Sequence, residues 1–352
     1  MFFVYDPQDP QAHLYDVNDE STVITLADWY HTLARQGPRF PTPDPMLING
    51  KGRFKLGVAQ DLSIITVEVG KRYRFQLVNI ACDPAYTFSI DSHDVTIIKV
   101  DGVNSQPHTI DSFDIFAGQR YSIVVNANQP VGNYWIRANP NLGVGLGFEG
   151  GINSAVLRYV GAPNADPPVI EEKAGRHLKE PDLHPIENPG APGPPFVGGV
   201  DHALNLLFKF KGASGTFTID NHSFESPSVP VLLQILSGAQ ASKDLLPEGT
   251  VFPLPGNSTI ECPRWPSPFP FTWRFNSSRV VSIGASGDNV TIRFKIDNPG
   301  PWFLHWHIDW HLEAGFAVVF AEDVPNVATF NSVPQAWKDL CPKYDALDPI
   351  DH

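Results

Sequence analysis

The stretch LSIITVEVGKRYRFQLVNI (62–80) decides the fold class, because apolar and polar residues alternate along most of its length. A period of two sends successive side chains to opposite faces, which is typical of a half-buried β-strand. The runs 62–69 and 73–80 are therefore predicted to be two strands.

The same pattern extends over both halves of the chain. In the first half it recurs in STVITLADW (21–29), DVTIIKVDG (94–102), RYSIVVNAN (120–128) and GNYWIRAN (132–139). In the second half, strand-like runs resume in HALNLLFKF, GTFTID, VPVLLQIL, NVTIRFKID, PWFLHWHI and FAVVFAE, whereas helical hints such as QAWKDLCP are few and short. Many short strands joined by turns predict an all-β protein built of sandwiches or barrels.

The chain length and a Pro- and Gly-rich stretch near the middle of the sequence predict two domains. At roughly 150 residues per domain, a chain of this length suggests two or three compact units. Between about 161 and 200 the sequence turns to stretches such as NPGAPGPPFVGG, which lack periodicity and are typical of a linker on a surface. The predicted organisation is a β-sandwich domain over 1–160, a linker over 161–200 and a second β-sandwich domain over 201–352.

Composition excludes several classes of function. Lys and Arg total 25 against 38 Asp and Glu, and the net charge of −13 repels polyanions, so no nucleic-acid partner is expected. No apolar run approaches the roughly 18 residues that a membrane-spanning helix needs, so no membrane partner is expected. The N-terminal stretch MFFVYDPQDPQ reaches Asp6 before the apolar core of a signal peptide could form.

Other features point toward a secreted protein. Asn-x-Ser/Thr glycosylation motifs begin at Asn221, Asn257, Asn276 and Asn289, although such short motifs also arise by chance. The 3 cysteines are an odd number, so at least one has no disulfide partner within the chain. Together these features describe a secreted protein that lacks its beginning. The alternative is coincidence in a sequence rich in Asn, Ser and Thr.

One segment carries metal-binding chemistry. GPWFLHWHIDWHLEAGF (300–316) places His305, His307 and His311 close together in the sequence. If the segment is a strand, His305 and His307 share one face and Trp306 lies on the other. Three imidazoles this close suggest a transition-metal site, since neutral imidazole binds Cu, Zn, Fe or Ni. The alternative is that they are surface or hydrogen-bonded histidines of an aromatic-rich strand.

The same segment resembles the C-terminal copper motif of the fungal laccases, which are multicopper oxidases. In that family the motif reads His-Cys-His, three residues, His, and then an axial position five residues further on. Similar stretches run along nearly the whole chain, among them VYDPQDPQAHLYDV, STVITLADWYH, LINGKGR, CDPAYTFSID, GGINSAVLRY, VPVLLQILSGAQ and VPQAWKDLCPKYDALDP. The resemblance implies two Greek-key cupredoxin-like domains, corresponding to the second and third of the family.

Laccases oxidise phenols and aromatic amines by one electron at a blue copper, and a three-copper cluster then reduces dioxygen to water. The resemblance implies copper as cofactor, these substrates and dioxygen as partners, and a secreted glycoprotein active in lignin degradation. By the same likeness, His305 and His307 would be ligands of the three-copper cluster and His311 a ligand of the blue copper. Phe316 falls at the axial position, where an absent ligand tunes the potential.

Two further residues match family positions that contact the substrate. Asp83 in CDPAY would bind the phenolic hydroxyl or the amine and help to take its proton. Phe40 in GPRFP matches an aromatic residue that lines the pocket, where His311 would also contact the substrate. Without the resemblance, they would be interpreted as a turn-forming Asp and a core Phe.

The sequence departs from the family at positions on which copper chemistry depends. Trp306 stands where the family has the Cys copper ligand, and an indole has no lone pair to offer a metal. The upstream motif His-Pro-x-His-x-His is replaced by SPFPFTWRFNSSRVVSIGASGDN, which is shortened and contains no histidine. The first cupredoxin domain, the natural partner of the other two, is missing. Cysteines matching Cys82 and Cys341 normally pair with that domain, so exposed free thiols are expected.

Four interpretations stay open. The first is a laccase-type enzyme, alone or completed by another polypeptide, although we expect the isolated chain to lack activity. The second is a noncatalytic cupredoxin-type protein that binds at most one copper or zinc weakly through His305, His307 and His311. The third is an incomplete or misread version of an ordinary secreted laccase, which explains every departure by one cause. The fourth, a structural β-sandwich unrelated to copper, requires the match to HWHIDWHLEAGF to be accidental.

Overall fold

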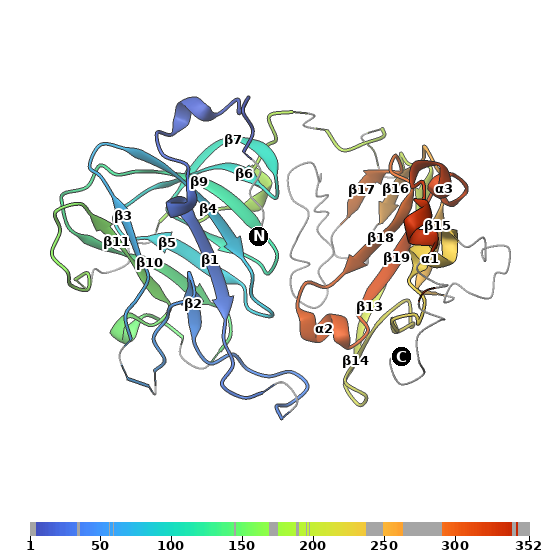
Figure 1. Ribbon diagram of the computed structural model, residues 1–352, viewed down its shortest axis with the longest axis horizontal. Helices are drawn as coiled ribbons and strands as arrows, with labels where there is room; N and C mark the ends of the chain where they lie inside the picture. Colours follow the sequence, from blue (N-terminus) through green and yellow to red (C-terminus); the bar gives the residue numbers. More distant parts are fainter. Residues whose placement is uncertain are drawn as a thin grey trace. The chain divides into compact units, whose positions relative to one another are not determined.

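The computed structural model describes residues 5–33, 36–55, 57–58, 60–143, 146–168, 175–187, 190–194, 196, 198–236, 249–262, 291–339 and 343. These residues form two compact units (Figure 1). The first unit takes the described residues of Met1–Ala191 and the segment His307–Glu313. The second takes those of Pro192–Trp265, Thr291–Trp306 and Ala314–His352. The expected mostly β architecture is confirmed, whereas the boundaries at 160 and 200 stay predictions.

One sheet of the first unit has six strands among the described residues, in the order β2-β1-β4-β9-β6-β7. Its strands are β1 (Val23–Asp28), β2 (Met46–Ile48), β4 (Arg72–Asn79), β6 (Val95–Val100), β7 (Val103–Ile110) and β9 (Arg120–Asn126). β1 runs parallel to β4, with Leu26 opposite Asn79, while the other neighbours are antiparallel. The parallel pair brings the carboxyl ends of β1 and β4 to the same edge of the sheet.

A second sheet of this unit follows the order β3-β11-β10-β5-β8 in the described chain. Its strands are β3 (Ile64–Val67), β5 (Tyr86–Ile90), β8 (Ser112–Ile115), β10 (Asn133–Pro140) and β11 (Ser154–Tyr159). Fully buried side chains from the two sheets, including Phe75 and Ile97 from one and Phe88 and Ile136 from the other, form one core. The unit is therefore a β-sandwich, whose apolar burial supplies its main stabilisation. The predicted alternation appears directly in β3, where exposed and buried residues alternate.

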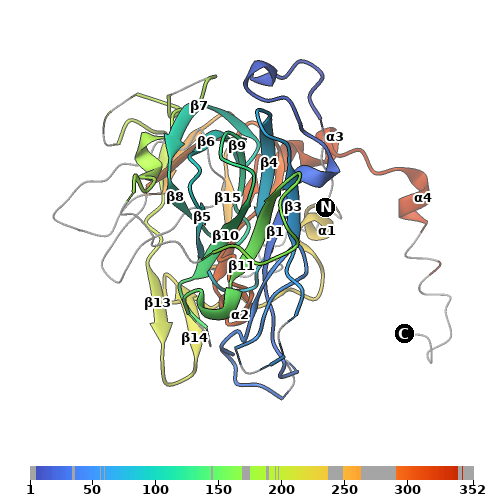
Figure 2. The same ribbon diagram turned by 90° about the vertical axis from the view of Figure 1, so that its left-hand side faces the viewer.

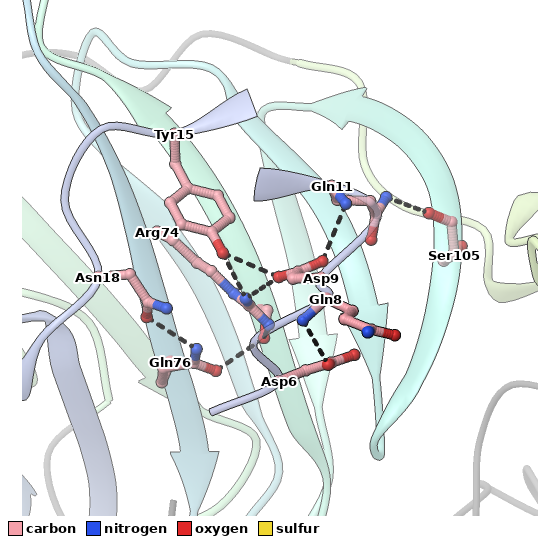
Figure 3. Close-up of polar contacts among 10 residues, drawn as sticks. Asp6, Gln8, Asp9, Gln11, Tyr15, Asn18, Arg74, Gln76 and Ser105 are labelled. Atoms are coloured by element: carbon pink, nitrogen blue, oxygen red, sulfur yellow. Dashed lines mark hydrogen bonds and ion pairs between the residues drawn. The ribbon is translucent and has the colours of Figure 1, made fainter. Parts of the chain in front are cut away.

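The outer face of β4 is covered as well, which its alternating sequence did not predict. Arg74 on this face is only 7% exposed, because the N-terminal segment lies across it (Figure 3). The Arg74 guanidinium forms an ion pair with Asp9 and donates to the Tyr15 hydroxyl at 3.1 Å. Beside it, Gln76 donates to Asn18 at 3.2 Å. Polar partners thus cover a face that the strand pattern alone assigns to water, although the Nε atom of Arg74 has no hydrogen-bond partner in the described chain.

Residues 175–187, which fall within the predicted linker, are anchored to the first unit. Leu178 and Leu183 belong to its hydrophobic core, at 6% and 8% exposure. A β-bridge pairs His177 with Ser112. This part of the Pro- and Gly-rich region therefore runs along a domain surface and contributes to its packing.

The second unit contains three small sheets among its described residues, ordered β12-β16-β17, β13-β14 and β15-β19-β18. The strands are β12 (His202–Ala203), β13 (Phe208–Lys211), β14 (Thr216–Ile219), β15 (Val251–Leu254), β16 (Thr259–Cys262), β17 (Ile292–Lys295), β18 (Gly300–His305) and β19 (Ala317–Glu322). β13 and β14 form an antiparallel pair and lie side by side in both views (Figure 2). The run HALNLLFKF, expected as one strand, is divided between β12 and β13.

Helices are short in the described chain, namely α1 (Val231–Leu236), α2 (Asp309–Glu313), α3 (Val327–Phe330) and α4 (Gln335–Lys338). The strand expected over VPVLLQIL is wrong, because this stretch forms α1. A short continuous apolar run does not distinguish a strand from a helix, and Pro230 directly before α1 accepts the first helical bond, from Leu233 at 2.9 Å. The helix expected in QAWKDLCP is confirmed as α4. No helix in the described ranges is long and apolar enough to span a bilayer.

Candidate functional site

The loop that follows β4 carries Asp83, and two polar side chains fix its backbone. Because β1 and β4 are parallel and Asn79 at the end of β4 lies opposite Leu26, the loop after β4 begins near Asp28, the last residue of β1. The Asp28 carboxylate accepts hydrogen bonds from the backbone N–H groups of Cys82 at 3.0 Å and Asp83 at 3.1 Å. From the other side, the Asn79 amide donates to the carbonyl oxygen of Pro84 at 3.2 Å. The loop is therefore held on both sides of Asp83.

The Asp83 side chain is half-buried, and its pKa is raised. Burial and then the negative charge of Asp28 raise the pKa of Asp83 to about 6. Next to this pair, the Tyr86 side chain is fully buried, and its hydroxyl has no hydrogen-bond partner within the described residues. Burial raises the pKa of Tyr86, and Asp28 and Asp83 add to that effect. The loop thus presents a carboxyl group that changes its protonation in mildly acidic solution.

Helix α2 meets the same loop from a distant part of the sequence, within the first unit. The Cys82 thiol donates to the Asp309 carboxylate at 3.1 Å, and the backbone N–H of Asp309 donates to the Cys82 carbonyl at 3.0 Å. The indole N–H of Trp310 lies 3.5 Å from the Tyr30 hydroxyl, which donates to Asp28 at 2.8 Å. A chain of polar contacts therefore joins α2 to Asp28.

Two of the residues predicted to contact a substrate are in direct contact. The rings of Phe40 and His311 pack edge to face, with centroids 5.7 Å apart and planes at 72°. Burial lowers the pKa of His311, which favours the neutral imidazole. Asp83 is connected to this pair indirectly, through the contact between its neighbour Cys82 and Asp309.

The three predicted metal ligands do not come together as a strand face. β18 ends at His305, whose Nδ1 lies 2.8 Å from the backbone oxygen of Trp306. His307 lies beyond the strand, with its imidazole so close to Gly118 that a Cβ there would approach it to 2.3 Å. The alternation assumed for His305 and His307 is therefore wrong, because the strand ends before His307. Across the described ranges, no group of three or more His, Cys, Asp or Glu is arranged to hold a metal ion.

Trp306 and Phe316 occupy an apolar aromatic stack in the second unit. The Trp306 indole lies on the Phe316 ring, with centroids 4.7 Å apart and planes at 15°. Phe316 is 4% exposed and stacks with its other neighbour, Phe217, at 4.8 Å and 10°. Phe208 closes the cluster edge to face on Phe316, at 5.1 Å. Indole and phenyl rings stacked in this way present no metal donor to this position.

The expectation of exposed free thiols concerned Cys82 and Cys341. Cys262 is buried at 6% exposure, and burial raises its pKa to about 12. Cys82 is unpaired and half-buried. Cys341 lies outside the described residues, as does the altered stretch SPFPFTWRFNSSRVVSIGASGDN (267–289) with Asn276 and Asn289.

Comparison with known proteins identifies the family of this chain. The sequence profile of the multicopper oxidases matches residues 20–162 and 264–326. The chain is 56% identical to the laccase of Pycnoporus cinnabarinus over 376 positions, which cover 99% of this chain and 72% of that protein. With laccase-2 of Trametes versicolor the identity is 57%, over 98% of this chain and 72% of that protein. The chain belongs to the laccase family.

Solved structures show that the laccase fold extends over the chain. The laccase from Botrytis aclada matches with a TM-score of 0.71 at 24% identity, covering 93% of this chain and 68% of that one. Fet3p, described as a multicopper oxidase that functions in iron import, matches with a TM-score of 0.71 at 20% identity, covering 96% and 72%. These two likenesses concern the fold alone.

Membership in the laccase family implies copper, and the residues that the resemblance aligns with the blue copper site do not fit it. Copper at such a centre binds a thiolate and imidazoles, whereas this chain offers Trp306 packed on Phe316. Because the indole N–H is a donor only, no rotation of Trp306 creates a ligand.

Sequence reasoning missed the residues that hold the loop of Asp83, above all Asp28, Tyr30 and Tyr86. A signal for Asp28 was present, since a charged residue ends the alternating run STVITLAD. What the sequence did not reveal is the parallel pairing of β1 with β4, which places Asp28 beside Asp83. Tyr86 carries no signal, because a buried aromatic residue on a strand is ordinary.

Proposed function

We propose that this laccase-family chain keeps a site for phenols and aromatic amines but lacks a working blue copper. As a result, the purified chain does not couple phenol oxidation to the reduction of dioxygen. The observation that carries the proposal is the stack of Trp306 on Phe316. The likeness to laccases aligns these two residues with the thiolate ligand and the axial position. The residual copper ligands by family likeness are His305, His307 and His311.

The electron balance of laccase chemistry supports the loss of activity. Removing one electron from a phenol requires an acceptor whose oxidation state changes, and in laccases this acceptor is the thiolate-bound copper. The alignment adds support, because 376 aligned positions exceed the 352 residues of this chain. The Pycnoporus laccase therefore has residues inside the aligned region that this chain lacks.

The site that would receive a phenol is formed by Asp83, Phe40 and His311. A phenolic hydroxyl would donate to the Asp83 carboxylate, and the ring would lie against Phe40. The neutral His311 imidazole would supply a further hydrogen-bonding group. These roles follow from the likeness to laccases, and the edge-to-face contact of Phe40 with His311 supports them.

We infer that metal binding by this chain is at most weak. Tight sites use three or four fixed ligands, whereas no group of three or more His, Cys, Asp or Glu in the described ranges is arranged to hold a metal ion. Dialysis against a weak chelator, followed by metal analysis, tests this inference. Stoichiometric copper or zinc that survives dialysis and is lost in His311→Ala would contradict it.

Oxygen uptake with guaiacol as substrate tests the proposed loss of activity. The purified chain, supplied with copper, is compared with the laccase of Trametes versicolor at equal concentration and pH. We expect no uptake above the buffer rate and no intense blue absorption. Guaiacol-dependent oxygen uptake that disappears in His311→Ala would overturn the proposal.

We also propose that the protein is secreted and glycosylated, organised as the two cupredoxin-like domains predicted above. Asn221 and Asn257 are exposed and occupy left-handed turn positions, with φ of 70° and 57°. Both asparagines are therefore accessible to a glycosyltransferase in the folded chain. Peptide mass analysis of protein secreted by a fungal host tests their occupancy.

A further inference from the structure

We propose that Asp28 is a positioning residue for phenol recognition, which fixes the backbone of Asp83 and sets the charge that Asp83 carries. The inference rests on the proposed phenol site and adds to it a residue and a pH dependence. Its structural basis is the group formed by Asp28, Tyr30, Asp83 and Tyr86 at the carboxyl ends of β1 and β4 and the start of β5.

The Asp28 carboxylate is saturated by donors from three directions. The backbone N–H groups of Cys82 and Asp83 donate at 3.0 Å and 3.1 Å, and the Tyr30 hydroxyl donates at 2.8 Å. These three hydrogen bonds fix the Asp28 carboxylate against the loop of Asp83.

Asp83 is in the opposite situation. Its backbone is held by Asp28, yet no group in the described part of the chain donates a hydrogen bond to its carboxylate. The negative charge of Asp28 opposes ionisation of Asp83, and a carboxyl group without donors keeps its proton to higher pH. Burial and the charge of Asp28 accordingly raise the pKa of Asp83 to about 6.

The ionisable groups that surround Asp83 are consistent with its raised pKa. Asp28 and Tyr30 face it from β1 and the residues after it, and Tyr86 faces it from β5. Cys82 precedes it in the loop, and Asp309 approaches that thiol from α2. None of these groups is a cation, so none favours the ionised form of Asp83.

The consequence for a phenol follows from hydrogen-bond chemistry. A phenol has a pKa of about 10 and is a neutral donor near neutral pH. Ionised Asp83 accepts a charge-assisted hydrogen bond from the phenol hydroxyl, and such a bond is stronger than a hydrogen bond between neutral groups. Phenol binding should therefore strengthen as the pH rises through about 6. Removing the charge of Asp28 should move this rise to lower pH.

A carboxyl ¹³C NMR titration tests the charge assignment without any ligand. The Asp83 signal is assigned by its absence in Asp83→Asn. In Asp28→Asn we expect its midpoint to fall by about one pH unit, because one like charge is gone while burial remains. Asp16→Asn is the matched control, since Asp16 also accepts a backbone N–H, from Arg72 at 2.8 Å at the other end of β4. An unchanged Asp83 midpoint in Asp28→Asn overturns the inference.

Binding of guaiacol, with veratrole as the analogue that lacks the hydroxyl, tests the functional consequence. In the wild type, guaiacol affinity should rise through pH 6 and veratrole affinity should not. In Asp28→Asn, the midpoint should shift to lower pH and the plateau affinity should weaken about fivefold, as for a lost hydrogen bond. A purely structural role would weaken binding equally at every pH and would leave the midpoint in place.

The two measurements separate the inference from the proposed function. If guaiacol does not bind the wild type at any pH, the proposed phenol site is wrong, while the NMR titration still decides the role of Asp28. Circular dichroism checks that Asp28→Asn is folded. Asp28→Ser, whose hydroxyl accepts one N–H without charge, replaces it in both measurements if the Asn variant does not fold.

Discussion

The Cys82 sulfur lies 3.1 Å from a carboxylate oxygen of Asp309, although 227 positions separate the two residues. The backbone of Asp309 returns a second bond to the Cys82 carbonyl at 3.0 Å. This double contact ties the loop of Asp83 to the segment of His311 within the first unit. The loop after β4 and helix α2, which are far apart in the sequence, therefore hold each other in place.

The Cys82 thiol should be nearly inert toward alkylation in the folded chain. Burial, followed by the hydrogen bond to Asp309, raises the pKa of Cys82 to about 12, so the reactive thiolate is scarce at pH 8. We expect its iodoacetamide labelling to be at least about 100-fold slower than in urea. Peptide-level mass spectrometry measures the rate. In Asp309→Asn the rate should rise, and a wild-type rate equal to that in urea would contradict the assignment.

The ion pair of Asp9 and Arg74 should make the N-terminal segment sensitive to acid. Both side chains are buried, at 7% and 8% exposure. Burial raises the pKa of Asp9, but hydrogen bonds from Gln11 and Tyr15 and the charge of Arg74 outweigh it and leave the pKa below its usual value. Because the folded pKa is depressed, the stabilisation is present above about pH 4 and is lost as the pH falls through the folded value.

Asp9→Asn should therefore lower the free energy of unfolding by about 3 kcal/mol at pH 7, because it leaves a buried guanidinium without its counter-charge. Urea denaturation at pH 7 and pH 3 measures the effect. The difference between wild type and variant should shrink at pH 3, where the wild-type carboxyl begins to take up its proton. The matched control Asp16→Asn removes an exposed pair with Arg72 and should cost much less than Asp9→Asn, because solvent screens exposed ion pairs. Equal losses in the two variants would contradict this account.

The sequence predicted the strands of the first unit well because period-two alternation and burial coincide there. β3 and β1 lie where LSIITVEV and STVITLADW place them, since one face of each meets the core. The pattern failed for VPVLLQIL, whose continuous apolar run fits either a strand or a helix. It also failed for the polar face of β4, because a non-local segment covers Arg74.

The candidate site was predictable only in part. Phe40 and His311 were named from the resemblance, and the structure places them in contact. The role of Asp28 depends on parallel pairing between strands that are distant in sequence, which a local pattern does not contain. The alternation predicted that His305 and His307 share one face of a strand. That prediction was wrong, because β18 ends at His305 and His307 lies beyond it.

Two glycines of the LINGKGR stretch should respond differently to alanine. Gly50 has a φ of +74°, but open space surrounds its Cβ position, so Gly50→Ala should cost about 1 kcal/mol of backbone strain. At Gly52 a Cβ would come within 2.2 Å of the Met46 carbonyl oxygen, which is backbone of β2. Gly52→Ala should therefore cost more than about 2 kcal/mol, since the strand must shift. Thermal unfolding of both variants tests the order, and a larger loss in Gly50→Ala would refute it.

Replacing Trp306 with the cysteine of the family should not by itself restore a blue copper. The thiol would stand beside Phe316 and leave a void where the indole stacks at 4.7 Å, so Trp306→Cys should lower the free energy of unfolding by about 2 kcal/mol. Trp306→Phe keeps a ring on Phe316 and should cost about 1 kcal/mol. Urea denaturation gives both values, and a copper titration followed by visible absorption gives the second readout. Because Phe316 and the upstream stretch without histidine remain in both variants, neither should turn blue. An intense blue band in Trp306→Cys with one bound copper would show that the remaining histidines suffice, and the proposed loss of activity would then rest on residue 306 alone.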